Sequence, residues 1–157
     1  MAGGSWRDDR HVITYGEARA VIEAQNRTMA DVDEKAIQTV RFNTVLVGLL
    51  LAAANVSGPS TFHPTFFGLG IASLAGSMFL GLITYDESNL FVGPRGSYIV
   101  ALTHGETPEP WDVDLLESLA AMVSTNDGEI ERNAKLLTAT QATLVVGVVT
   151  AVLSVAI

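Results

Sequence analysis

Residues 31–56 read DVDEKAIQTVRFNTVLVGLLLAAANV, and this stretch changes from charged to wholly apolar along its length. Five charged residues fall among its first eleven positions, and none falls among its last fifteen. Upstream, TYGE offers Thr14 as an N-cap with Glu17 three residues later, which is a capping box. Apolar residues then recur at helical spacing, and no proline intervenes before Pro59. We therefore expect one helix from about residue 14 to residue 56. Its charged part lies in water, and its uncharged part lies in the membrane.

The composition supports a division of the chain into apolar and charged segments. The 157 residues are 48% hydrophobic with a mean hydropathy of +0.34, yet the formal net charge is −8. A uniform soluble globule does not combine these values, whereas separate membrane and aqueous segments do. Seven of the nine basic residues are arginines, and acids are many, a pattern typical of proteins that work in high salt. A halophilic origin is one hypothesis, and an ordinary acidic protein is the alternative.

Three segments have the length and composition of membrane spans, at residues 36–56, 64–84 and 136–157. A helix needs about 20 apolar residues to cross the hydrocarbon core. The second and third segments carry no charge, and Arg41 in the first can extend its guanidinium to the interface. Any one of them could be a buried helix of a soluble core, but three in so short a chain favour spans. The N-terminal residues lack the features of a signal peptide, so we expect the first span to remain as an anchor.

The basic residues predict the orientation of these spans. Six of the nine lie in residues 1–43 and three lie in residues 85–135, whereas the loop 57–63 has none. The positive-inside rule therefore places residues 1–35 and 85–135 in the cytoplasm of a multi-pass protein of the cell membrane. The loop 57–63 and the C-terminus are then external.

Each span carries small residues at four-residue spacing, which lets helix backbones approach closely in lipid. We expect them to pack helices within one chain or between chains. Asn43 and Gln141 are the polar side chains least suited to lipid, and we expect them to form hydrogen bonds between helices or to lie at the interface. The predicted helix-packing residues are Gly48, Ala52, Gly68, Ala72, Gly76, Gly147 and Ala151.

Two amphipathic stripes outside the spans need a partner, because they have no lipid to face. The second follows a helix start at Pro110 and Trp111. They can pair with each other as a cytoplasmic helical stalk or with copies in other subunits. The predicted interface residues are Val21, Ile22, Met29 and Val32 in the first stripe, and Leu115, Leu119 and Met122 in the second.

Two local features are less regular. The sequence NDG at residues 126–128 indicates a turn or a kink. Residues 88–103 could form a β-hairpin around GPRG, or Ser97 could cap a short helix, and the helix is slightly favoured.

We find no constellation of catalytic, cofactor-binding or metal-binding residues. There is no cysteine, and the three histidines lie far apart in the sequence. GPRG at residues 93–96 lacks the spacing of a phosphate loop; a turn is favoured over an anion site at Arg95. No span carries a well-buried ionisable residue, which argues against transport. We therefore expect neither an enzyme nor a cofactor, and no nucleic-acid partner.

The segment ADVDEKAIQTVRFNTVLVGLLLAAA, Ala30–Ala54, resembles the start of the first span in Pycsar transmembrane effectors and the related SLATT proteins. The similar features are Asp33-Glu34-Lys35-Ala36, the following Asn43, and TNDGEIERNAKLL before the last span. The resemblance covers about a third of the chain. It implies an anti-phage membrane protein that oligomerises on a signal from a cyclic nucleotide or a sensor protein and impairs the membrane. No recognisable nucleotide pocket is present, so no ligand-binding residues are carried over.

The sequence therefore predicts an all-α integral membrane protein with three transmembrane helices and a cytoplasmic helical stalk. Two functions remain open. One is a membrane-impairing effector that acts by homo-oligomeric assembly. The other is a constitutive structural or accessory subunit of a membrane complex.

Overall fold

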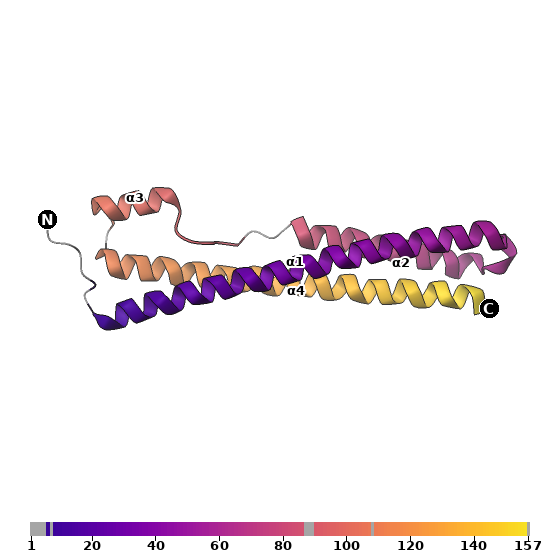
Figure 1. Cartoon of the computed structure of the whole chain (residues 1–157), viewed down its shortest axis with the longest axis horizontal. Coiled ribbons are helices and arrows are strands. Elements are labelled where there is room, and N and C mark those ends of the chain that lie inside the picture. The colour runs from indigo at the N-terminus through magenta and orange to yellow at the C-terminus, as the bar shows by residue number, and fades with distance from the viewer. Residues whose placement is uncertain (1–5, 7, 87–89, 108, 157) are drawn as a thin grey trace. The chain divides into compact units, whose positions relative to one another are not determined.

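The computed structural model describes residues 6, 8–86, 90–107 and 109–156, and its elements are helical (Figure 1). They are α1 (Asp9–Ser57), the short 3₁₀ helix η1 (Pro59–Thr61), α2 (Pro64–Asp86), α3 (Gly96–His104) and α4 (Trp111–Ala156). No strand occurs among these described residues. The all-α prediction is therefore confirmed.

The chain divides into two compact units, and each is described by itself. Unit 1 comprises Met1–Met29 and Asn89–Glu131. Unit 2 comprises Ala30–Ser88 and Arg132–Ile157. Since α1 and α4 contribute residues to both units, each unit takes one part of these two long helices.

Helices α1, α2 and α4 are each long and apolar enough to cross a membrane. The predicted spans 36–56 and 64–84 lie within α1 and α2, and the third lies within α4 up to residue 156. Residue 157 and residues 1–5, 7, 87–89 and 108 of the other predicted segments lie outside the described residues.

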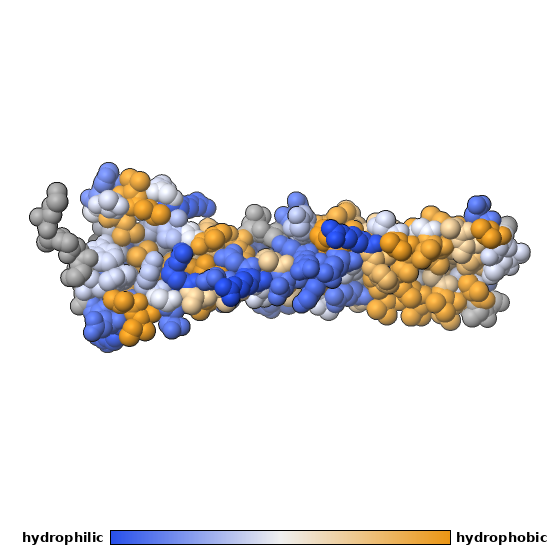
Figure 2. Space-filling view, in the orientation of Figure 1, coloured by the Kyte–Doolittle hydropathy of each residue, from blue (hydrophilic) through white to orange (hydrophobic). Residues whose placement is uncertain are grey.

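Large apolar side chains cover the outside of unit 2, as expected for a surface that faces lipid. Figure 2 shows this apolar surface over the C-terminal ends of α1 and α4. At least half of the surface of many of these side chains is exposed, which would be unfavourable in water and is favourable in hydrocarbon. They include Phe42, Val45, Leu49, Leu51, Val56, Phe79, Leu82, Val145, Val149, Val152 and Val155.

Glycines allow the helices of unit 2 to approach closely. A Cβ atom added to Gly147 would lie 2.8 Å from the Leu74 side chain and 3.1 Å from Leu74 N. One added to Gly70 would lie 3.0 Å from Ala151 N. One added to Gly81 would lie 2.7 Å from a methyl carbon of Val40. These contacts join α2 to both α1 and α4.

A chain of hydrogen bonds crosses all three helices of this bundle. Asn43 Nδ2 donates to Ser77 Oγ at 2.8 Å, and Ser77 Oγ donates to Thr140 O at 2.7 Å. All three residues are fully buried. The prediction that Asn43 bonds between helices is confirmed, whereas Gln141 is exposed and lines a shallow pocket with Lys35.

In unit 1, α1 begins five residues earlier than the predicted cap at Thr14. Asp8 is the N-cap, because its Oδ1 accepts a hydrogen bond from Arg10 N at 2.9 Å. The Arg10 side chain also donates to this carboxylate, which lowers the pKa of Asp8. The capping-box prediction is therefore wrong: Thr14 lies inside the helix because Asp8 supplies a stronger, charged cap.

The described part of residues 88–103 forms a short helix rather than a hairpin. Helix α3 starts after Arg95, so Ser97 lies within its first turn and is not the cap. It ends at Gly105, whose left-handed φ of 70° closes the C-terminus. The preference for a helix here is confirmed.

The prediction of a turn or kink at NDG is wrong. Helix α4 continues through residues 126–128 without interruption. Asn126 is fully buried, and its side chain uses its hydrogen-bonding groups on neighbouring segments instead of on its own backbone. Packing therefore overrides the local turn preference of the three residues.

Candidate functional site

The two predicted cytoplasmic stripes are used largely within one chain. Ile22, Met29 and Leu119 are buried in unit 1, and Leu115 and Met122 are half-buried there. Val21 is 40% exposed on the outer face of α1. Val32 is buried, but it belongs to unit 2. The apolar stripes of α1 and α4 thus form the core of unit 1. Val32 is counted in unit 2 because the part of α1 that belongs to unit 1 ends at Met29.

The predicted helix-packing residues fall into two groups in unit 2. Gly147 and Ala151 are buried against α2, and Gly76 makes an ordinary contact, 3.9 Å from Thr143. The others are exposed, and a Cβ on either glycine among them would meet no atom of another described segment within 4 Å. These outward residues are Gly48, Ala52, Gly68 and Ala72.

A buried network of amide side chains joins α1, α4 and the segment before α3. Asn126 Oδ1 accepts from Phe91 N at 2.8 Å, and Asn126 Nδ2 donates to Phe91 O at 3.0 Å. Asn126 Nδ2 also donates to Gln25 Oε1 at 3.2 Å. Gln25 Nε2 in turn donates to Asp127 Oδ1 and to Val123 O. The network thus holds the backbone of Phe91 on α4 and joins α4 to α1 through Gln25.

A second polar contact links the same two helices near their starts. His11 Nδ1 lies 2.8 Å from Asp112 Oδ2. The Asp112 carboxylate is fully buried, whereas the His11 side chain is 29% exposed. The residues are 101 positions apart in sequence, so no local pattern indicates that they meet.

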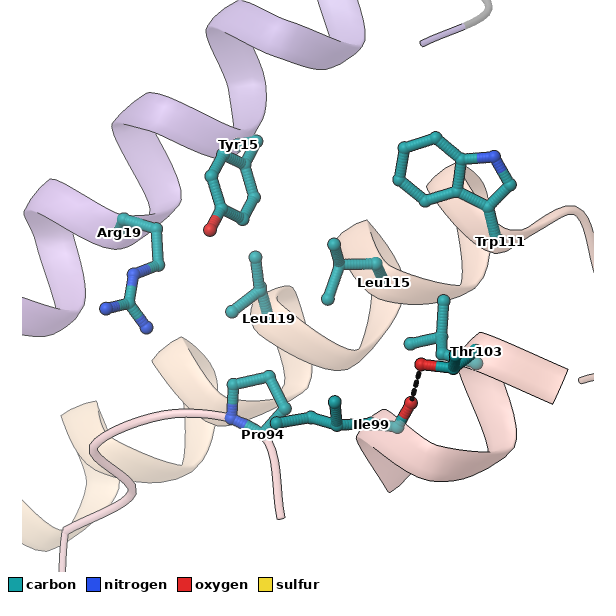
Figure 3. A pocket seen from close by; sticks show the side chains of 9 residues that line it. Tyr15, Arg19, Pro94, Ile99, Thr103, Trp111, Leu115 and Leu119 are labelled. Carbon is teal, nitrogen blue, oxygen red and sulfur yellow. Dashed lines mark hydrogen bonds between the residues drawn. The ribbon is translucent and has the colours of Figure 1, made fainter. Parts of the chain in front are cut away.

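A cavity of unit 1 lies between α1, α3 and α4, and we call it the unit 1 pocket (Figure 3). Its volume is about 470 Å³, within the range of small-molecule sites. It opens to the surface, since Tyr15 is 36% and Ile99 is 51% exposed. The lining residues are Tyr15, Arg19, Pro94, Ile99, Leu102, Thr103, Trp111, Leu115 and Leu119.

Arg19 is the cation of this pocket. Within the part of the chain that the structure describes, no carboxylate forms an ion pair with it. Gly93 leaves room for its guanidinium, because a Cβ there would lie 3.1 Å from Arg19 Nη1. By contrast, Arg27 on the same helix pairs with Glu23. The charge of Arg19 is therefore available to a ligand.

Aromatic rings gather beside the pocket. The ring centroids of Trp6 and Trp111 are 4.8 Å apart, and those of Trp6 and Tyr15 are 5.4 Å apart. Such tilted pairs stabilise by more than their buried area alone. Because Trp6 and Trp111 are the two tryptophans of the chain, tryptophan fluorescence reports on this unit.

A hydrogen bond from Tyr98 fixes α3 onto α4 on another side of the pocket. Tyr98 Oη donates to Asp114 Oδ2. Burial, followed by this hydrogen bond and the charge of Asp114, raises the pKa of Tyr98 to about 12. Together with the Phe91–Asn126 contact, this bond anchors both sides of the irregular segment before α3.

The described residues contain no group of three or more His, Cys, Asp or Glu side chains that could hold a metal ion. No family model, no curated protein and no solved structure matches the chain. The candidate site therefore rests on its own geometry.

The sequence predicted the roles of the apolar lining residues on α4 but not those of the polar lining residues on α1. Leu115 and Leu119 belong to the predicted stripe, and Trp111 was expected to start a helix. Arg19 and Tyr15 carry no local signal, because an arginine and a tyrosine on a charged helix usually face solvent. They line a pocket because α3 lies close to them in the folded chain.

Proposed function

We propose that this protein acts in a membrane by homo-oligomeric assembly and impairs that membrane as an effector of an anti-phage defence system. The membrane part is supported by three long apolar helices and by the apolar exterior of unit 2. The defence role is supported by the resemblance of Ala30–Ala54 and of the text before the last span to such effectors.

One observation favours assembly above the others. Thr44, Gly48 and Ala52 recur every four residues on α1, and all three are exposed. Apart from its chain neighbours and the backbone of its own helix, no atom of the described residues lies within 4 Å of where a Gly48 Cβ would be. Helices in lipid associate through small residues that permit close backbone contact. A second copy can use this face, because the bundle of the chain itself does not cover it.

The orientation is part of the same proposal. With unit 1 in the cytoplasm, a signal from inside the cell can reach it directly. All nine lysines and arginines then lie on the cytoplasmic side.

The test is inducible tethering of subunits through a dimeriser fused at the N-terminus, followed by dye uptake and growth of the host. We expect tethering to raise membrane permeability and to arrest growth. Gly48→Leu should weaken assembly, since it places a large side chain on the close-packing face. Ala53→Leu is the matched control, because Ala53 is also exposed but lies five residues further along the helix, on a different face from Gly48. Equal behaviour of the two variants would show that this face is not the interface.

A structural or accessory subunit is the second candidate. It is favoured by exposed apolar side chains at the start of α1 in unit 1, where Val12 is 44% and Ile13 is 65% exposed. A different protein could cover them. Tethered oligomers in an intact, impermeable membrane would support this role and contradict the effector.

A further inference from the structure

We propose that the unit 1 pocket binds a small organic carboxylate with a flat, apolar body. The proposal concerns unit 1 by itself and does not depend on assembly or on membrane damage. It begins from the contrast between the apolar lining of the pocket and the charge of Arg19. A site for small molecules commonly has this form, with a mostly apolar wall and a few polar groups that fix orientation.

The charge of the ligand follows from Arg19. Its guanidinium is the one cationic side chain that lines the pocket, and it makes no ion pair with the described residues. Thr103 already donates its hydroxyl to Ile99 O at 2.8 Å. Figure 3 shows the hydroxyl of Tyr15 on the same side of the pocket as Arg19. A carboxylate can accept hydrogen bonds from both groups, and one guanidinium balances one negative charge.

The shape of the ligand follows from the rest of the lining. Trp111 lies away from Arg19 in Figure 3, with Leu115 and Leu119 between them. Tyr15 and Trp111 offer ring surfaces, and Ile99 and Leu102 of α3 close another side. A flat ring stacks favourably against aromatic side chains, and its burial removes apolar area from water. An aromatic monocarboxylate therefore satisfies the charge and the apolar surface together.

Hydrogen bonds to α4 fix the segment that lines one side of the pocket. Tyr98 bonds to Asp114 and fixes α3 against α4, while Phe91 is fixed by Asn126. Pro94 lies between these two anchors in the sequence and lines the pocket. Because both flanks of this segment are bonded to α4, its lining residues are positioned before a ligand arrives.

The experiment is calorimetric titration of the full chain in lipid nanodiscs with 2-naphthoate, with empty nanodiscs as the background. The neutral isostere 2-naphthamide measures the apolar contribution alone. We expect saturable binding of 2-naphthoate and binding of the amide that is about tenfold weaker or more, because a charged hydrogen bond is lost. Arg19→Gln should lower the affinity for 2-naphthoate to that for the amide and leave the amide unchanged.

Arg27→Gln is the matched control, since Arg27 is on the same helix, is paired with Glu23 and does not line the pocket. It should leave both affinities unchanged. The proposal is overturned if 2-naphthoate shows no saturable binding, or if acid and amide bind equally. An equal loss in the Arg19 and Arg27 variants would also overturn it, since that outcome reflects overall charge.

Discussion

The side-chain amide of Asn126 pairs with both backbone groups of Phe91. Phe91 N donates to Asn126 Oδ1 at 2.8 Å, and Asn126 Nδ2 donates to Phe91 O at 3.0 Å. The amide thus replaces the neighbouring strand that an extended segment would otherwise need for its backbone groups. A helical side chain thereby anchors the segment that leads into α3 and the unit 1 pocket.

Asn126→Ala should destabilise unit 1 by about 1–3 kcal/mol, because Gln25 and the backbone of Phe91 lose partners in a buried setting. The measurement is the denaturant midpoint followed by the fluorescence of Trp6 and Trp111. Thr125→Ala is the matched control, since its exposed hydroxyl bonds only within its own helix, to Ala121 O. Equal midpoints for the two variants would contradict a structural role for the amide pair.

This contact also shows where prediction from the sequence succeeded and failed. Apolar runs of about 20 residues predicted all three candidate spans, because a helix that crosses the hydrocarbon core needs apolar side chains over its whole length. NDG was misread as a turn, because the usual behaviour of Asn and Gly is local. The partner of Asn126 is 35 residues away, so only the tertiary arrangement reveals that its side chain acts on another segment.

The glycines of the spans also show what could and what could not be predicted from the sequence. Four-residue spacing selected Gly147, which lies close to Leu74, but could not separate it from Gly68, which has the same spacing and faces outward. It also missed Gly70, which makes a close contact with Ala151 of α4. Spacing identifies a stripe, whereas the rotation of each helix in the bundle decides which stripe is buried. For the pocket, the sequence supplied the leucines of α4 but not the placement of α3 against them.

Gly147→Ala should destabilise the bundle of unit 2 by about 1–3 kcal/mol, the usual range for overpacking. The added methyl would lie 3.1 Å from the backbone nitrogen of Leu74, which cannot rotate away. Gly68→Ala should be neutral or slightly stabilising, since its methyl meets nothing and alanine favours a helix. Unfolding in mixed detergent compares the two variants, and a Gly68→Ala loss as large as that of Gly147→Ala would refute the assignment of faces.

The Asn43–Ser77 hydrogen bond should contribute about 0.6–2 kcal/mol to the stability of unit 2, the range for polar pairs between helices in lipid. A double-mutant cycle with Asn43→Leu and Ser77→Ala measures the coupling directly. The control cycle pairs Ser77→Ala with Thr44→Ala, because exposed Thr44 bonds to Val40 O within its own helix. Zero coupling in the first cycle would mean that the 2.8 Å contact contributes no free energy to the stability of unit 2.

Tyr98 should ionise at a higher pH than an ordinary tyrosine side chain. Its folded pKa is raised to about 12, whereas the unfolded value is about 10. The folded state therefore binds the proton more tightly, so this stabilisation is complete below about pH 10 and is lost as the pH rises towards 12. Ultraviolet titration of tyrosinate measures it, and Tyr98→Phe should remove the phase at high pH. A wild-type titration with a single phase near pH 10 would contradict the buried hydrogen bond to Asp114.

The orientation of the spans should follow the nine basic residues. Reporter fusions at Met1, Ser57, Gly105 and Ile157 should read inside, outside, inside and outside, in that order. Gly105 is the critical position, because it follows α3 in unit 1 and an external reading there excludes three spans with a cytoplasmic unit 1.

The role of the basic residues in this orientation can be tested with two lysines placed in the short loop, by Ser60→Lys with Thr61→Lys. Both positions are exposed, so the change should disturb the topology through charge rather than through packing. The matched control is Ser97→Lys with Glu106→Lys, which adds lysines at exposed sites on the side that already carries them. This control should leave all four readings unchanged, whereas a disturbance as large as that of the loop variant would show that the basic residues do not set the orientation.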